Sequence, residues 1–122
     1  SGVRSIEVGD RVWQPTYTND LAYNTLLLLA NNRKGVYCMA SHGQASFFDM
    51  ACEILRLLAI DDRFSIKPVP SGQISASEKA KRPETAIMEN RRLADEGLDR
   101  QRAWQESLAE YLNHPYFRTL FA

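Results

Sequence analysis

Two stretches of the chain alternate between polar and apolar residues with a period of two, the pattern of a strand that buries one face. They are residues 5–8 and 64–69, each followed by turn-forming residues. Residues 36–40 are instead a short run of mostly strand-forming residues between turn signals. This run predicts a third strand, buried inside the protein.

The first half of the chain also carries the signals of two helices. One begins at Thr18 or Asn19 and runs to about residue 31. Its inward face is predicted to contain Leu21, Thr25, Leu28 and Leu29, with Ala22 and Leu26 beside them. The other begins after Ser46, whose spacing to Asp49 is typical of a capping box, and runs to about residue 59.

Two more helices are predicted in the second half. Asn90 can cap a short helix that runs through Glu96, and Gly97 occupies the position after it that tolerates positive φ. The last helix carries Trp104, Leu108, Tyr111 and Leu112 on one face. It stops at His114-Pro115, and the aromatic tail that follows is expected to pack back on the domain.

These elements predict one α/β domain of α+β-like character over residues 1–122. We expect a small sheet of about three short strands, covered by about four helices. Residues 11–16 lie between the first strand and the first helix, and Pro15 favours extended geometry at Gln14. Residues 71–82 are polar and are expected to form a loop.

Composition narrows the classes of partner. The formal net charge of the 122 residues is zero, so no overall attraction to nucleic acid or to an anionic membrane is expected. The longest apolar run, residues 26–30, is far too short to span a bilayer, and no signal peptide is visible. The two cysteines lack a metal-type or CxxC spacing, which favours buried thiols in a reducing, cytoplasmic setting.

Several motifs of catalysis are missing from the sequence. There is no GxGxxG, no P-loop, no HExxH and no GxSxG. None of the five tyrosines is followed four residues later by lysine, so the Tyr-x-x-x-Lys proton-transfer pair is absent. His42 and His114 fall in a loop and at a helix end. We therefore assign no catalytic residue and no metal ligand to this chain.

Two groups of residues together resemble dTDP-4-dehydrorhamnose reductases. Residues 10–22 read Asp-Arg-Val-Trp-Gln-Pro-Thr-Tyr-Thr-Asn-Asp-Leu-Ala, similar to that family's Asp-Gln-x-Gly-x-Pro-Thr-x-x-x-Asp-Leu-Ala. Lys81-Arg82-Pro83, Asn90-Arg91-Arg92-Leu93 and Trp104-Gln105-Glu106-Ser107-Leu108 resemble its later motifs. Gly35-Val36-Tyr37 and Ser46-Phe47-Phe48 match the strand and helix start between them.

The resemblance implies an extended short-chain dehydrogenase/reductase of deoxysugar or rhamnose biosynthesis. Its N-terminal Rossmann half, with NAD(P)H and the catalytic Tyr and Lys, would lie outside this chain. This part would bind a dTDP- or UDP-linked sugar, would bind no cofactor alone and would be inactive by itself. Arg11 replaces the family glutamine and Trp13 the glycine. An arginine there resembles related epimerases and dehydratases, in which it and the arginine of a later Arg-Pro pair contact the diphosphate.

Five residues are the candidates for the substrate site. The planar guanidinium forks of Arg11 and Arg82 suit a diphosphate, because each can donate two parallel hydrogen bonds. Trp13 could cover a base or sugar face, and Gln14 and Thr16 could donate to hydroxyls or phosphate oxygens. Plainer roles stay open: an ion pair of Arg11 with Asp10 or Glu7, a solvated surface position for Arg82, and packing alone for Trp13.

Alternative functions also stay open. The chain could be a non-catalytic regulatory or binding module on the same scaffold, or part of a nucleotide-sugar epimerase or dehydratase. It could also be a folded core without activity, in which an apolar face left bare by the missing half drives self-association.

Overall fold

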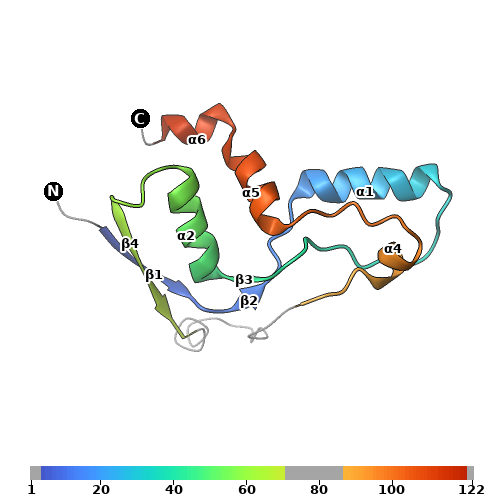
Figure 1. Cartoon of the computed structure of the whole chain (residues 1–122), viewed down its shortest axis with the longest axis horizontal. Coiled ribbons are helices and arrows are strands. Elements are labelled where there is room, and N and C mark those ends of the chain that lie inside the picture. Colours follow the sequence, from blue (N-terminus) through green and yellow to red (C-terminus); the bar gives the residue numbers. More distant parts are fainter. Residues whose placement is uncertain (1–3, 71–86, 121–122) are drawn as a thin grey trace, which may run out of the picture.

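A computed structural model describes residues 4–70 and 87–120. The elements follow one another as β1 (Arg4–Gly9), β2 (Val12–Trp13), α1 (Thr18–Ala30), β3 (Ala45–Ser46), α2 (Phe47–Leu57), β4 (Phe64–Val69), α4 (Arg91–Asp95), α5 (Trp104–Leu112) and α6 (Pro115–Thr119). Figure 1 shows β1, β4 and α2 at one end and α1 and α4 at the other, with α5 between them. The prediction of a mixed α/β domain is confirmed.

The strands form two small ladders in the described part of the chain, where a single sheet was predicted. β1 pairs with β4 in parallel, from Arg4 opposite Phe64 to Gly9 opposite Val69. β2 pairs with β3 in antiparallel orientation. The two predicted strands at residues 5–8 and 64–69 are therefore confirmed, and they pair with each other.

The predicted strand at residues 36–40 is not formed. The segment is extended but has no strand beside it, and Val36 is exposed where a buried residue was predicted. The side chain of Asn90 bonds the backbone of Ala40 instead: its Nδ2 donates to the carbonyl oxygen at 2.7 Å and its Oδ1 accepts from the amide at 2.9 Å. A run of strand-forming residues becomes a strand only when another strand is available to pair with it.

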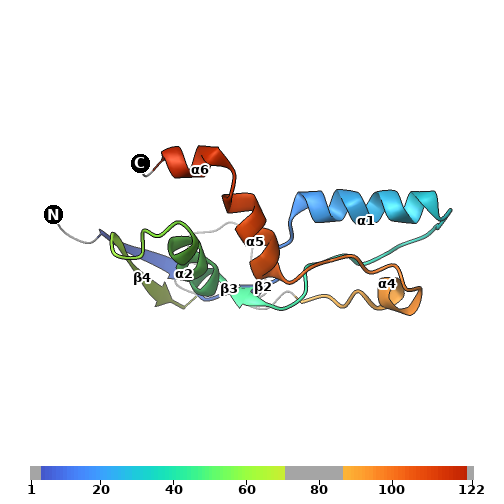
Figure 2. The same ribbon diagram turned by 45° about the horizontal axis from the view of Figure 1, so that its top comes forward.

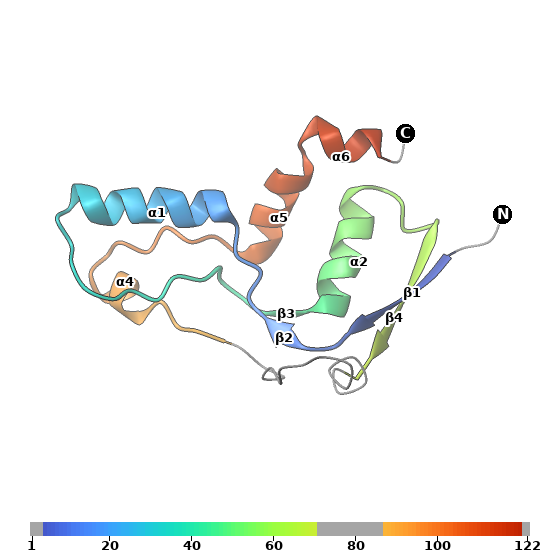
Figure 3. The same ribbon diagram turned by 180° about the vertical axis from the view of Figure 1, so that it is seen from behind.

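The start of α2 confirms the predicted capping box. Ser46 Oγ accepts from the Asp49 amide at 3.0 Å, and Asp49 Oδ2 accepts from the Ser46 amide at 3.1 Å. α2 lies against the β1–β4 ladder and beside α5, as Figures 2 and 3 show from two further directions. Between these helices lies a buried cluster of Ala45, Trp104, Leu108 and Leu112.

The last helical stretch agrees with the prediction in part. α5 ends at Leu112, before His114-Pro115. Pro115 then begins the short helix α6, which is a favourable place for proline because the first helical amide needs no partner. Phe117 packs against the cluster between α2 and α5, so the expected return of the tail is confirmed at that residue.

The inward face of α1 is not the one predicted. Leu28 is buried as expected, but Leu26 and Leu29 are exposed. Leu27, which was not predicted on that face, packs with Leu28 against Leu93 and Leu98. The other buried residues of the helix are polar: Asp20 and, completely, Asn24. The apolar period identified the helix correctly but not the side that packs.

Asn90 precedes α4 as predicted but does not cap it through its side chain, since that side chain is bonded to Ala40. Gly97 has φ +72°, which confirms the positive-φ position after the helix.

A cluster of charged and aromatic side chains ties α4 to the chain after α1. Tyr37 Oη donates to Glu96 Oε1 at 2.6 Å, and Arg92 Nε donates to Glu96 Oε2 at 2.9 Å. The Arg92 guanidinium lies 4.1 Å from the centre of the Tyr37 ring. The hydrogen bond to Glu96 raises the pKa of the Tyr37 phenol. The same bond, together with that from Arg92, lowers the pKa of Glu96.

The raised pKa of Tyr37 predicts a loss of stability at alkaline pH. Because the pKa of Tyr37 is higher in the folded state, its contribution is present below the ordinary value of 10.0 and is lost as pH rises through the raised value. The difference in absorbance titration at 295 nm between the protein and its Tyr37→Phe variant should have a midpoint above 10.0. Glu96→Gln should move that midpoint down. A Tyr37 midpoint unchanged by Glu96→Gln would contradict the prediction.

Candidate functional site

Residues 10–17, which we call the site segment, connect β1 to α1 and contain four of the five candidate residues. Its start continues the parallel ladder, because the Asp10 amide donates to the Val69 carbonyl at 3.1 Å. Val12 and Trp13 then pair with β3, and Pro15 is buried. The segment is therefore held to two different ladders before the chain enters α1.

Gln14 and Thr16 fasten the site segment to two distant stretches of chain. Gln14 Nε2 donates to the carbonyls of Ser41 (3.3 Å) and Met88 (3.0 Å), and its Oε1 accepts from the Met88 amide at 2.6 Å. Thr16 Oγ1 donates to the Gln14 carbonyl at 2.9 Å and accepts from the Ser41 amide at 3.1 Å. Both amide hydrogens of Gln14 and the hydroxyl hydrogen of Thr16 are already donated. Donation from either to a ligand stays a prediction, and it would require giving up one of these bonds.

Two buried side-chain nitrogens of the site segment, Arg11 Nε and Trp13 Nε1, have no hydrogen-bond partner among the described residues. No ion pair of Arg11 occurs among those residues either. The plainer role of pairing with Asp10 or Glu7 is therefore not seen. A buried polar atom without a partner is rare in native proteins and calls for an explanation, such as a ligand that supplies the missing acceptor.

Trp13 belongs to an aromatic hollow on one side of the site segment. Its ring lies 5.1 Å from that of Phe47, at an angle of 41°. The hollow has a volume of about 310 Å³, and its lining includes Trp13, Thr16, Tyr17, Trp104 and Tyr111. The tilted contact with Phe47 gives Trp13 a packing role. The hollow leaves room for a flat ring beside Trp13.

A second, more polar hollow also includes a residue of the site segment in its lining. Its volume is about 330 Å³, and it is lined by Gln14, residues 41–44 and residues 87–90. Ser41 is buried there, and its Oγ has no hydrogen-bond partner among the described residues. The Nε2 of His42, which also lines this hollow, lies 2.9 Å from Asp99 Oδ2, so this loop histidine is paired with a carboxylate. The site segment thus contributes to an aromatic hollow and to a more polar one.

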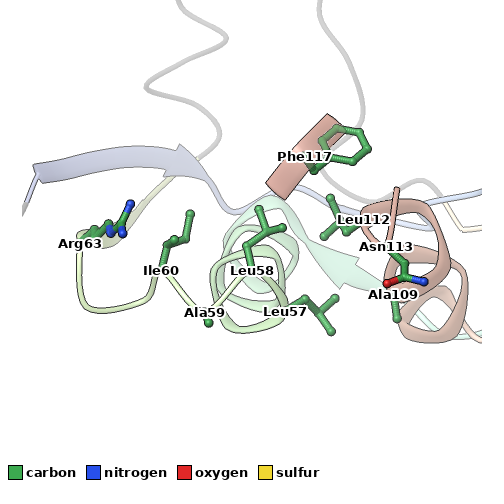
Figure 4. A pocket seen from close by; sticks show the side chains of 9 residues that line it. All are labelled: Leu57, Leu58, Ala59, Ile60, Arg63, Ala109, Leu112, Asn113 and Phe117. Carbon is green, nitrogen blue, oxygen red and sulfur yellow. The ribbon is translucent and has the colours of Figure 1, made fainter. Parts of the chain in front are cut away.

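A third hollow is lined by none of the four candidate residues that the structure describes. Figure 4 shows this space of about 450 Å³ between α2, α5 and α6. Its lining combines apolar side chains, among them Leu57, Leu112 and Phe117, with the polar residues Arg63 and Asn113. The four described candidate residues lie elsewhere, so we place the functional site at the site segment.

Arg82, the fifth candidate residue, lies outside the residues that the structure describes, so its role stays a prediction. Within residues 4–70 and 87–120, no three His, Cys, Asp or Glu side chains are placed to hold a metal ion. None of the helices in those ranges is long and apolar enough to cross a membrane.

A dinucleotide cofactor does not fit the helix starts that the structure describes. Such a cofactor needs a glycine-rich turn whose amides approach the pyrophosphate at a helix N-terminus. α1, α2 and α5 are preceded by Tyr17, Ser46 and Ala103 instead. No step involving NAD(P)H is therefore assigned to residues of this chain.

Sequence reasoning missed the residues that hold α1, the helix that follows the site segment, to residues 98–107. Asp20 accepts from Arg102 Nη2 at 2.8 Å and from Ser107 Oγ at 2.5 Å. Asn24 bonds the backbone of Leu98 and Arg100. The signal was the placement of two short polar side chains four residues apart, on the same side of a mostly apolar helix.

The site segment thus lies between β1 and α1 of a small mixed α/β fold, with hollows beside it. The model of the RmlD substrate binding domain family matches residues 5–117. The chain belongs to this family.

Individual relatives support the assignment. A dTDP-4-keto-6-deoxy-D-glucose reductase of Streptomyces niveus is 33% identical over 107 residues, covering 87% of this chain and 36% of that protein. The crystal structure of a dTDP-4-dehydrorhamnose reductase of Clostridium acetobutylicum has a TM-score of 0.85 and 31% identity, over 93% of this chain and 40% of that one. The Bacillus anthracis reductase in complex with NADP has a TM-score of 0.82 and 23% identity, covers 90% of this chain and 38% of that one, and supports the fold alone. This chain thus spans little more than a third of the length of these proteins.

Proposed function

We propose that this chain is the C-terminal, nucleotide-sugar-binding domain of an NAD(P)-dependent reductase similar to the dTDP-4-dehydrorhamnose reductases. Family membership and the names of the relatives support this reading. The observation that carries it is the buried Nε of Arg11, which has no hydrogen-bond partner among the described residues, on a segment that the side chains of Gln14 and Thr16 hold in place. We further propose that cofactor and catalytic groups belong to an N-terminal Rossmann half, so that this chain alone turns over nothing.

In this proposal the residues of the segment have different tasks. Arg11 donates to the diphosphate of a dTDP- or UDP-linked sugar, which supplies the acceptors its guanidinium lacks. Trp13 covers the base or sugar from the side of the aromatic hollow. Gln14 and Thr16 act mainly by holding the backbone of the segment in place, with Arg82 as a further diphosphate contact.

Isothermal titration with dTDP and dTDP-rhamnose tests the role of Arg11. We expect weak binding by the isolated chain, reduced by about ten- to a hundredfold in Arg11→Ala, because charge-assisted hydrogen bonds of about 1.5–3 kcal/mol are lost. Arg56→Ala is the control, since Arg56 is an exposed arginine on α2 that already pairs with Glu53. Equal losses in both variants would show a nonspecific charge effect and would refute the assignment.

The claim of inactivity has its own test. Incubation of the chain with NADPH and dTDP-4-dehydrorhamnose should leave the absorbance at 340 nm unchanged. Clear oxidation of NADPH by this chain alone would overturn the claim.

A further inference from the structure

Trp13 carries a polar group that the packing of its ring does not use. The ring lies against that of Phe47, with the two centroids 5.1 Å apart. The indole Nε1 is nevertheless buried and has no hydrogen-bond partner among the described residues. A tryptophan whose N–H is buried usually has an acceptor for it, because the indole nitrogen can only donate. Packing on Phe47 therefore does not account for the whole side chain.

The side chain of Trp13 lies on the same side of the site segment as that of Arg11. Side chains two positions apart in extended chain point to the same face, and Val12 and Trp13 form strand β2. Val12 pairs with Ser46, and this register continued by one residue places Phe47 opposite Arg11. The ring contact between Phe47 and Trp13 is then the diagonal contact expected of side chains on one face. We infer that Arg11, Trp13 and Phe47 share this face.

Two buried donors without a partner are thus present on one face of a short segment. Arg11 Nε and Trp13 Nε1 can each donate one hydrogen bond and accept none. Buried polar groups are almost always bonded in native proteins, so two such groups two residues apart call for one common explanation. No carboxylate in the described part of the chain pairs with Arg11. A bound group that offers lone pairs to both nitrogens would supply what they lack.

The charge of Arg11 favours an oxyanion as this group. A phosphate has several oxygens on one centre, so two donors can reach it from the same side. Hydrogen bonds to an ionised acceptor are also roughly twice as strong as those between neutral groups. A sugar hydroxyl could accept from either nitrogen, but it would leave the guanidinium without a counter-charge.

We propose that the indole N–H of Trp13 is a second donor to the phosphate group that Arg11 binds, so that the two side chains hold one oxyanion between them. This rests on the proposed function and adds a binding residue to it. The Trp13 ring lines the aromatic hollow, while its N–H edge faces the phosphate. Glycine, which stands at this position in the family motif, has no side chain to make this contact. We therefore assign the contact to this chain and not to the family.

The indole N–H signals in nitrogen–proton correlation NMR spectra test the contact directly, because the chain has two tryptophans, Trp13 and Trp104. Inorganic pyrophosphate is the probe, since it has no ring that could enter a hollow. It should move the Trp13 signal downfield and slow the exchange of that proton with water. Trp104, which also lines the aromatic hollow, should not respond. Sodium chloride at the same ionic strength should move neither signal.

Substitutions separate the N–H of Trp13 from its ring. Trp13→Phe keeps an aromatic ring beside Phe47 and removes the donor. By isothermal titration it should weaken the binding of dTDP and of pyrophosphate alike, by about tenfold, because a hydrogen bond to a charged group is lost in both cases. Arg11→Ala should abolish the response of the Trp13 signal to pyrophosphate. Arg56→Ala, on α2, should leave every readout unchanged.

Failure of this proposal differs from failure of the proposed function. Binding of dTDP that depends on Arg11, with no response of the Trp13 signal to pyrophosphate, would overturn the role of Trp13 alone. So would a loss in Trp13→Phe that appears with dTDP but not with pyrophosphate, because the ring would then be responsible. Absence of binding by both ligands would overturn both proposals. If Trp13→Phe does not fold, the titration of the unaltered chain still decides, because proximity to the Phe47 ring assigns the Trp13 signal.

Discussion

Asp20→Ala is expected to lower the free energy of unfolding by about 3 kcal/mol. Asp20 is a buried residue whose carboxylate joins three parts of the chain. Its Oδ1 accepts from Arg102 Nε and Nη2, and its Oδ2 accepts from Ser107 Oγ. Alanine leaves the buried Ser107 hydroxyl without this acceptor and removes the more buried of the two carboxylates that pair with Arg102.

The same arginine provides the control. Arg102 Nη2 also lies 3.1 Å from Glu110 Oε2, but the side chain of Glu110 is 52% exposed, against 11% for Asp20. Because water screens exposed ion pairs, Glu110→Ala should cost less than about 1 kcal/mol. Urea unfolding at neutral pH, followed by circular dichroism, measures both variants. Equal losses would show that burial does not decide the strength of this network.

Asn24→Leu is expected to cost about 3 kcal/mol although it preserves most of the side-chain volume. Asn24 is fully buried. Its Nδ2 donates to the Leu98 carbonyl at 2.8 Å, and its Oδ1 accepts from the Arg100 amide at 3.0 Å and from Gln101 Nε2 at 3.1 Å. Leucine would leave these groups without this partner, and an unsatisfied buried polar group costs about 1–3 kcal/mol.

Asn31→Leu is the matched substitution, at the end of the same helix. Asn31 Nδ2 donates to the Leu27 carbonyl at 2.8 Å, but the residue is exposed and water can replace the bond. Its cost should stay below about 1 kcal/mol in the same unfolding experiment. If Asn24→Leu were no more harmful than Asn31→Leu, the buried hydrogen bonds of Asn24 would contribute little to stability.

Elements whose signals are local were predictable from the sequence. The Ser46–Asp49 capping box depends on residues three apart, and it forms as expected. The strand at residues 64–69 is confirmed as well, and so is the turn at Gly97. In each case the residues that determine the structure are close together in the chain.

Features that depend on distant residues were not predictable. The side of α1 that packs is decided by Asp20 and Asn24, whose partners lie 74 to 87 residues further on. The strand at residues 36–40 needs a neighbouring strand, which no sequence period can supply. The candidate site was found as a contiguous segment, but the anchoring of Gln14 to Met88, 74 residues away, was not foreseen.

The spacing of these contacts also determines when the domain can fold during its synthesis. Asp20 and Ser107 are separated by 87 residues, so the polar side of α1 has no partner until most of the chain has been made. At roughly 5 to 20 residues per second, a ribosome needs roughly 4 to 17 seconds to cover that distance. Throughout this interval the bonds of Asp20 to Arg102 and Ser107 cannot form, so the polar side of α1 is completed only after α5 has been made.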